Sequence, residues 1–289
     1  MFSLMRKGSV QLKNFLPYLK STPEIFQLHA GDYRNGSMLP EGAVLVVGSA
    51  QSGVQIAEDL IYEGRKVFIS TSQVARVPRR FRGKDIVDWF ILTGFFDLRT
   101  IDVTDPQILL MKQPQTSSAG LRGHTSSLQA LARNGAVILG KMENADAVTI
   151  FLQLNASAHV KFADEFSMKV KTMINEYIKK SEQYAPPPEE DYADEPDENA
   201  VCATVATSLD LKENNITSII WTTGFTGDFS YLKLPVLDDD GKLKHVDGIS
   251  DIEGLYFLGF PWLRKRKSGI ILGIKEDAEF IAEQLLAHS

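Results

Sequence analysis

The sequence predicts an α/β fold with a parallel sheet, and three observations support it. Apolar β-branched runs at 44–47 and 67–70 enclose a segment with helical spacing, so residues 43–70 have the order strand, turn, helix, strand. Two more apolar runs, Ser218–Trp221 and Gly254–Gly259, return to this pattern near the carboxyl end. The chain of 289 residues is 44% hydrophobic and 24% charged, which allows one large or two moderate domains with extensive cores.

The turn after the first strand indicates a Rossmann-like NAD(P)-binding unit. Gly48 allows a tight turn, and Gly53 lets the helix pack closely on the strand. Exposed N–H groups at the helix start can then hold a pyrophosphate. Ala50 occupies the second glycine position, so a methyl group lies where the backbone usually approaches phosphate. The expected cradle comprises Gly48, Ser49, Ala50, Gln51, Ser52 and Gly53. The alternative is a unit that uses this turn only structurally.

The end of the second strand favours NADP over NAD. An NAD site usually has Asp or Glu here to bind the ribose 2′-hydroxyl, but this chain has Ser70-Thr71-Ser72. A basic loop follows, and arginine can bind a phosphate through two parallel hydrogen bonds. The candidates for the 2′-phosphate are Ser70, Arg76 and Arg80. The alternative is a solvated basic loop.

Composition and charge exclude several classes of function. The net charge of −6 argues against nucleic acid as a partner. Cys202 is the only cysteine, so a redox-active cysteine pair is ruled out within the chain, and a reducing cytoplasm is expected. The apolar stretch Leu255–Ile274 is interrupted by four basic residues, so no membrane span is expected. The five histidines lack metal-ligand spacing, and no residue is assigned a catalytic role.

The remaining segments suggest how the domains are arranged. Residues 1–42 are expected to form a lead-in, and 43–217 an NADP-binding domain with insertions. Within that domain we expect strands at Ala136–Leu139 and Val148–Leu154 and an amphipathic helix between Phe162 and Tyr184. Residues 185–200 are acidic and proline-rich, which is typical of an exposed, extended connection.

The last part of the chain, 218–289, is expected to form a second α/β segment. Ser268 and Gly269 precede a helix predicted at Glu276–His288, and the basic run Arg264–Lys267 lies directly before them. This arrangement suits an anion site at a helix start. A helix start with surface lysines explains it equally well.

Four motifs together resemble the flavin-containing monooxygenases, in particular a bacterial flavoprotein branch. They are VLVVGSAQSGVQIAEDL at 44–60, VARVPRRFRGKDI at 74–86, IIWTTGF at 219–225 and GLYFLGFPWLRKRKSGIILGIKEDAEFIAEQL at 254–285. The resemblance implies that 43–217 is the NADPH domain and 218–289 the C-terminal part of a three-layer FAD-binding domain. It also implies that Thr223 and Gly224 lie near both cofactors, and that Gly259, Ser268 and Gly269 approach the flavin.

The resembled family has another glycine fingerprint, for FAD, before the NADPH fingerprint. Neither Gly8 nor the glycines at 31–36 form such a pattern after a strand. We therefore expect the first FAD-binding segment to be missing, so FAD would bind only if a separate chain or a longer start supplied it. Two functions remain open. One is an NADPH- and FAD-dependent monooxygenase-type oxidoreductase acting on a small molecule. The other is a non-catalytic NADP(H)-binding module or degenerate remnant.

Overall fold

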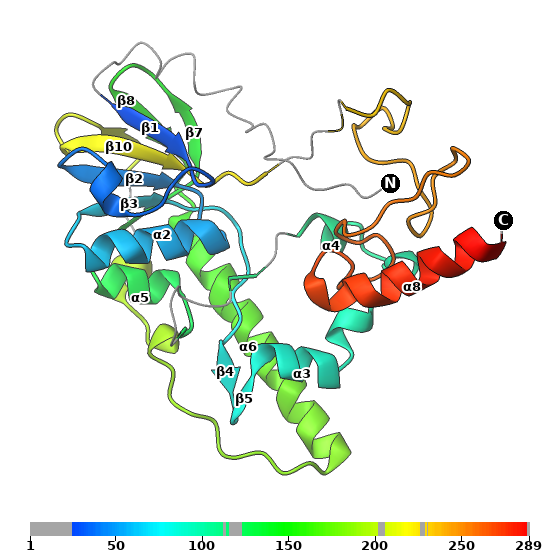
Figure 1. Cartoon of the computed structure of the whole chain (residues 1–289). Coiled ribbons are helices and arrows are strands. Elements are labelled where there is room, and N and C mark those ends of the chain that lie inside the picture. The colour runs from blue at the N-terminus through cyan, green and yellow to red at the C-terminus, as the bar shows by residue number, and fades with distance from the viewer. Residues whose placement is uncertain are drawn as a thin grey trace. The chain divides into compact units, whose positions relative to one another are not determined.

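The chain forms two compact units in a computed structural model that describes residues 25–111, 114–115, 123–201, 206–225, 229 and 231–287 (Figure 1). Of the described residues, 25–86, 114–115, 123–201 and 206–225 form the sheet unit. Residues 87–111, 229 and 231–287 form the C-terminal unit. Predictions that concern residues 1–24, Cys202 or His288 lie outside the described residues.

A five-stranded parallel sheet organises the sheet unit, which confirms the predicted α/β fold. Its strand order is β1 Phe26–His29, β10 Ile216–Trp221, β2 Ala43–Val47, β3 Val67–Ser70 and β6 Val137–Leu139. Helix α2, Gln51–Tyr62, links β2 to β3 and completes the predicted strand–helix–strand unit. Because successive side chains of a strand point to opposite faces, β2 contributes to two cores.

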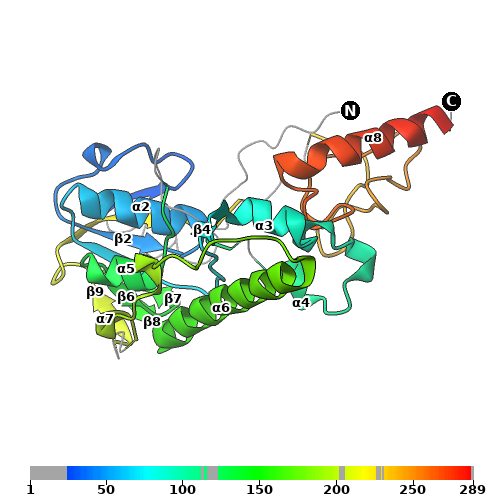
Figure 2. The same ribbon diagram turned by 90° about the horizontal axis from the view of Figure 1, so that it is seen from below.

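Both faces of this sheet are covered. On one face, Val44 and Val46 pack with side chains of α2 and of α5, Leu128–Arg133, and Figures 1 and 2 show both helices on that side. On the other face, Leu45 packs with side chains of an antiparallel sheet made of β7 Met142–Ala145, β8 Thr149–Leu152 and β9 Ser208–Asp210. Cover on both faces explains why β2 is apolar throughout rather than alternating.

Helix α6, Ala156–Ser181, confirms the predicted amphipathic helix but begins earlier than expected. Of the apolar residues expected on its buried face, Val170 and Ile174 are buried, whereas Phe162 and Phe166 are only half-buried. The buried stripe continues through smaller side chains, namely Ala156, Val160, Ala163 and Ser167. Phe162 and Phe166 thus lie beside the buried stripe rather than at its centre. The sequence pattern of large apolar residues could not distinguish these two positions.

The acidic segment 185–200 differs from the extended connection that its composition predicted. It contains a 3-10 helix, η4 Tyr192–Asp194, and leads into α7, Glu198–Val201. Ala193 and Ala200 are fully buried. Carboxylates of this segment bind partners in the sheet unit, as described below, so its charge anchors the segment.

The units also differ from the predicted domain boundaries. Strand β1 pairs with β10, and β10 lies between β1 and β2, so residues before 43 and after 217 belong to the same sheet. Residues 87–111 instead group with the C-terminal unit. The order of segments along the sequence could not predict these units, because parallel neighbours in a sheet come from distant parts of a chain.

The C-terminal unit contains mostly helices and turns. Its elements include most of α3 Ile86–Leu92, η2 Phe95–Asp97, η3 Thr100–Asp102, α4 Gln107–Leu110 and α8 Ile271–Ala287. The strand predicted at Gly254–Gly259 is not formed. Leu255 and Phe257 are buried in a small apolar cluster, but both bounding glycines have positive φ, +74° and +82°, outside the strand region. Helix α8 begins five residues before the predicted Glu276.

Two small elements complete the sheet unit. They are the 3-10 helix η1 Gly36–Met38 and a hairpin of β4 Arg80–Phe81 and β5 Lys84–Asp85. Among the described residues, no helix has the length and apolar character needed to cross a membrane.

Candidate functional site

The carboxyl edge of the parallel sheet brings together four segments that are distant in sequence. They follow β1 at His29, β2 at Val47, β3 at Ser70 and β10 at Trp221. The chain passes from β2 through α2 to β3 on one side, while β10 and β1 lie on the other side of β2. Ligands of open α/β sheets bind in the crevice at such a switch in strand order.

Two glycines allow the turn after β2 to pack tightly. Gly48 has φ of +113°, and its N–H donates to the Ser70 carbonyl oxygen at 2.9 Å. A Cβ on Gly53 would lie 2.1 Å from the Gly48 carbonyl oxygen, and one on Gly48 would lie 2.6 Å from Thr222 Oγ1. The structure thus shows the tight turn that was predicted at Gly48 and the close packing that was predicted at Gly53.

The amino end of α2 is electrically suited to an anion. Ala50 is the N-cap residue and makes no side-chain capping bond, and the first turn has no acidic residue. The helix macrodipole therefore meets no negative side chain of its own first turn, and Ser52 in that turn is exposed. Pyrophosphate is the ligand that this arrangement suits in a strand–turn–helix unit.

The segment after β10 fixes the other side of the turn, through residues that sequence reasoning missed. Thr222 Oγ1 lies 2.9 Å from both the Val47 and Gly48 carbonyl oxygens. His29 Nε2 lies 3.1 Å from the Gly224 carbonyl oxygen, and the Gly31 N–H donates to His29 Nδ1 at 3.2 Å. Since a carbonyl only accepts, these contacts assign the ring proton to Nε2. Thr223 and Gly224 are exposed at this edge.

The hydroxyls at the end of β3 are largely committed to the protein itself. Ser70 is buried, and its hydroxyl donates to the Gly140 carbonyl at 3.0 Å and accepts from the Met142 N–H at 3.0 Å. Thr71 donates to the Leu139 carbonyl at 2.7 Å. Thus Ser70, expected to bind a 2′-phosphate, instead ties β3 to the chain that follows β6.

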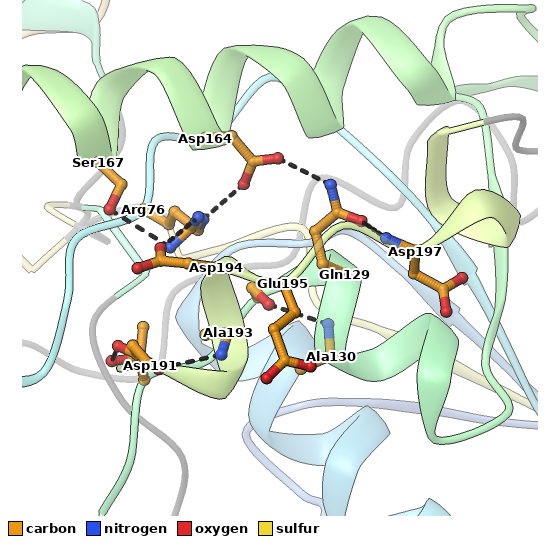
Figure 3. A network of polar contacts seen from close by, with 12 residues as sticks. Arg76, Gln129, Ala130, Asp164, Ser167, Asp191, Ala193, Asp194, Glu195 and Asp197 are labelled. Atoms are coloured by element: carbon orange, nitrogen blue, oxygen red, sulfur yellow. Dashed lines mark hydrogen bonds and ion pairs between the residues drawn. The ribbon is translucent and has the colours of Figure 1, made fainter. Parts of the chain in front are cut away.

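Arg76, the second residue expected to bind the 2′-phosphate, is buried in a polar network (Figure 3). Its Nε donates to Asp164 at 2.7 Å, its Nη2 to Asp194 at 2.9 Å and its Nη1 to Ser167 at 3.3 Å. Burial alone raises the pKa of Asp194, but Lys171 and Arg76 outweigh it and hold that pKa below its ordinary value. Arg76 therefore joins α6 to the acidic segment, and each of its three guanidinium nitrogens donates a hydrogen bond within the protein.

Further contacts hold the acidic segment in place. Gln129 Nε2 donates to the second oxygen of Asp164 at 2.9 Å, and Gln129 Oε1 accepts from the Asp197 N–H at 2.7 Å (Figure 3). Arg80, the third expected phosphate ligand, is exposed, and its Nη1 donates to the Gly123 carbonyl at 3.0 Å. Of the three candidates, Arg80 alone presents its side chain at the surface.

In the C-terminal unit, the residues expected near a flavin have clear structural contacts. Ser268 is buried, and its hydroxyl accepts from the N–H groups of Arg264 and Lys265 at 3.1 and 3.0 Å. A Cβ on Gly269 would lie 2.7 Å from Pro261 Cα. Gly259 has φ of +82° and open space where a Cβ would stand.

Arg264, Lys265 and Lys267 of the basic run before α8 have carboxylate partners within this unit. Lys265 and Lys267 both contact the Glu276 carboxylate, at 2.9 and 2.5 Å, and Lys267 also contacts Asp97 at 2.7 Å. Burial tends to lower the pKa of Lys267, but the bonds to Asp97 and Glu276 prevail and raise it. Arg264 and Arg266 lie over aromatic rings. The structure thus favours a self-contained cluster over an anion site. Among the described residues, no group of three or more His, Cys, Asp or Glu side chains could hold a metal ion.

The whole chain was compared with known proteins. No family model matches the chain. It is 28% identical over 284 residues to the "Uncharacterized oxidoreductase CzcO-like" of Geobacillus kaustophilus, which covers 97% of this chain and 63% of the relative. It is 29% identical over 262 residues to the "Uncharacterized oxidoreductase CzcO" of Bacillus subtilis, covering 90% and 58% respectively. The chain is therefore similar in sequence to proteins named CzcO-like oxidoreductases.

Solved structures confirm the fold. A flavin-containing monooxygenase from Stenotrophomonas maltophilia matches with a TM-score of 0.51 and 12% identity, over 98% of this chain and 59% of that one. A doubly substituted variant of a flavin monooxygenase from the same organism gives a TM-score of 0.52 and 14% identity, over 98% and 60%. The resemblance to the flavin-monooxygenase fold is therefore confirmed. The chain spans about three fifths of the length of these relatives.

Proposed function

We propose that this protein is an NADPH- and FAD-dependent oxidoreductase of the monooxygenase type, and that its sheet unit binds the NADPH. The turn at the carboxyl end of β2 carries the proposal. It joins a buried strand to the uncapped start of α2, and its packing admits no side chain at Gly53. Because the chain spans about three fifths of its relatives, the activity of the whole protein belongs to the proposal.

In this proposal the pyrophosphate lies over the start of α2, held by N–H groups between Gly48 and Gly53. The exposed segment Thr223–Gly224 borders the same edge of the sheet. Helix N–H groups recognise the charge of a pyrophosphate irrespective of the base or sugar attached to it. Selectivity for one dinucleotide must therefore come from the end of β3.

The preference for NADPH depends mainly on Arg80 in this proposal. Ser70 and Arg76 are left out because their polar atoms are engaged within the protein. Arg80 is exposed, and residues 70–73 include no carboxylate that would repel a 2′-phosphate.

FAD enters the proposal through the homology to oxidoreductases and the flavin-monooxygenase fold. A bound flavin would accept a hydride from NADPH and activate oxygen for transfer to a small-molecule substrate. Gly259, Ser268 and Gly269 stay proposed as the part of this chain nearest the flavin. A separate chain that completes the flavin site stays a proposal that the sequence alone suggests.

Ligand binding and colour test the proposal. We expect NADPH to raise the Tm of the purified protein, because a ligand that binds the native state stabilises it. We expect bound flavin to colour the protein yellow and to be bleached by NADPH without air. A colourless protein that still binds NADPH would favour a non-catalytic NADP(H)-binding module. A Tm that neither nucleotide changes would contradict both functions.

A further inference from the structure

Gln115 reaches the turn after β2 from 66 residues further along the chain. Its Nε2 donates to the Ser49 carbonyl oxygen. Its main chain is fixed as well, because its N–H donates to the Ala75 carbonyl and its carbonyl accepts from the Val77 N–H, both at 2.8 Å. The Gln115 amide is therefore held at the turn by the chain that leaves β3.

Two successive peptide groups of the turn thus have their carbonyls held by side chains. Thr222 Oγ1 binds the Gly48 carbonyl at 2.9 Å, and Gln115 binds the next carbonyl, that of Ser49. In a trans peptide the C=O and N–H bonds point in opposite directions, and the described chain has no cis peptide. The N–H of Ser49 consequently points away from Thr222, and the N–H of Ala50 points away from Gln115. Ala50 is the N-cap of α2, so its N–H is one of the groups at the helix start that can bind an anion.

The other end of the Gln115 amide indicates that this orientation has a cost. The side chain is fully buried, and its Oε1 has no hydrogen-bond partner among the described residues. A buried acceptor without a partner destabilises the folded state, whereas a methionine of similar length would place no such atom there.

We propose that Gln115 is a positioning residue that orients the Ser49–Ala50 peptide toward the dinucleotide pyrophosphate. This inference rests on the proposed function of the sheet unit as an NADPH site. Gln115 acts through the peptide that it holds, so it contacts no nucleotide itself. Its loss therefore affects the pyrophosphate and leaves the adenosine end of the ligand unaffected.

Gln115→Met in the full chain tests this role, since it keeps the length of the side chain and removes both amide atoms. We expect the Kd for NADPH, measured by calorimetry, to rise about tenfold, the loss of one hydrogen bond to a charged group. The Kd for adenosine 2′-monophosphate, which lacks the pyrophosphate, should stay within about twofold of the original. The variant removes the unpaired Gln115 Oε1 but leaves the Ser49 carbonyl without its partner. Because these two effects oppose each other, the Tm should change by less than about 2 °C.

Ser218→Ala is the matched control, because Ser218 is also fully buried in the sheet unit with an unpartnered hydroxyl, but lies within β10. It should leave both Kd values unchanged. An unchanged NADPH affinity in Gln115→Met would overturn the inference. A fall in Tm with equal loss of both ligands would also overturn it, because that is the result of a packing role. Gln115→Leu carries the same expectations if the methionine variant does not fold. If the unaltered protein bound no NADPH, the proposed function would fail first.

Discussion

Gly53→Ala places one methyl group at the contact that defines the proposed nucleotide site. The new Cβ would lie 2.1 Å from the Gly48 carbonyl oxygen and 2.9 Å from both the Gly48 carbonyl carbon and Thr222 Oγ1. Ordinary van der Waals contacts of a Cβ begin at 3.4 Å. The start of α2 and the end of β2 must therefore separate by about 1 Å, because the nearest atoms are backbone and cannot rotate away.

Two opposing effects set the magnitude. Alanine is favoured over glycine inside a helix by about 1 kcal/mol. Forcing a methyl group into a packed site costs about 1–3 kcal/mol, and the upper end applies where backbone must move. The net expectation is a loss of about 2 kcal/mol in the free energy of unfolding. For a unit of this size, that corresponds to a fall in Tm of about 4–8 °C.

Thermal unfolding and NADPH calorimetry on the full chain measure both consequences. We expect the NADPH affinity of Gly53→Ala to fall about tenfold or more, because the displaced helix start no longer matches the turn. Ser52→Ala is the control for the Tm alone, since Ser52 is exposed in the same helical turn and its change introduces no clash. Ser218→Ala, within β10, is the control for the NADPH affinity. A Gly53→Ala protein with the original Tm and the original Kd would refute the reasoning.

Three further predictions concern the basic loop and its network. Arg80→Ala should weaken NADPH about tenfold or more and leave NADH nearly unchanged, measured by calorimetry beside Lys161→Ala on the exposed side of α6. Equal loss for both nucleotides would exclude Arg80 as the phosphate ligand. Arg76→Met should lower the free energy of unfolding by about 2 kcal/mol in urea titrations, because Asp164 and Asp194 both lose a buried partner. Arg76→Met should not change the preference between NADPH and NADH. A changed preference would show that Arg76 takes part in binding the 2′-phosphate. The lowered pKa of Asp194 means that its contribution to stability is present above its ordinary value of 3.8 and is lost as the pH falls through the folded-state value. Asp194→Asn should therefore flatten the loss of stability on acidification below about pH 4, and an unchanged acid profile would contradict this assignment.

The sequence predicted the strand, turn and helix around residues 43–70 well, because these features depend on neighbouring residues. The apolar run at 44–47, the small residues that follow and the helical spacing of α2 lie within one continuous segment. Gly48 and Gly53 could be assigned packing roles because no other residue allows that turn and that approach. The strands at 67–70 and 137–139 followed from the same short-range pattern.

The partners of polar side chains could not be predicted in this way. Arg76 and Arg80 look alike in sequence, yet one is buried between two carboxylates and the other is exposed. The carboxylates come from positions 88 and 118 residues away. Composition likewise suggested an exposed segment at 185–200. It includes the negative charge of Asp194 but cannot show that Arg76 binds this carboxylate.

The sequence by itself determined a parallel α/β unit with a glycine turn of the dinucleotide-binding kind, since strand, turn and helix signals act over a few residues. The tertiary structure alone decided which groups surround that turn. Thr222 and Gln115 bind its carbonyls from remote segments, and Ser70 and Arg76 are committed to the protein interior. The physical reason is that the carboxyl edge of a parallel sheet gathers chain segments whose proximity is set by strand order, and no short-range pattern encodes that order.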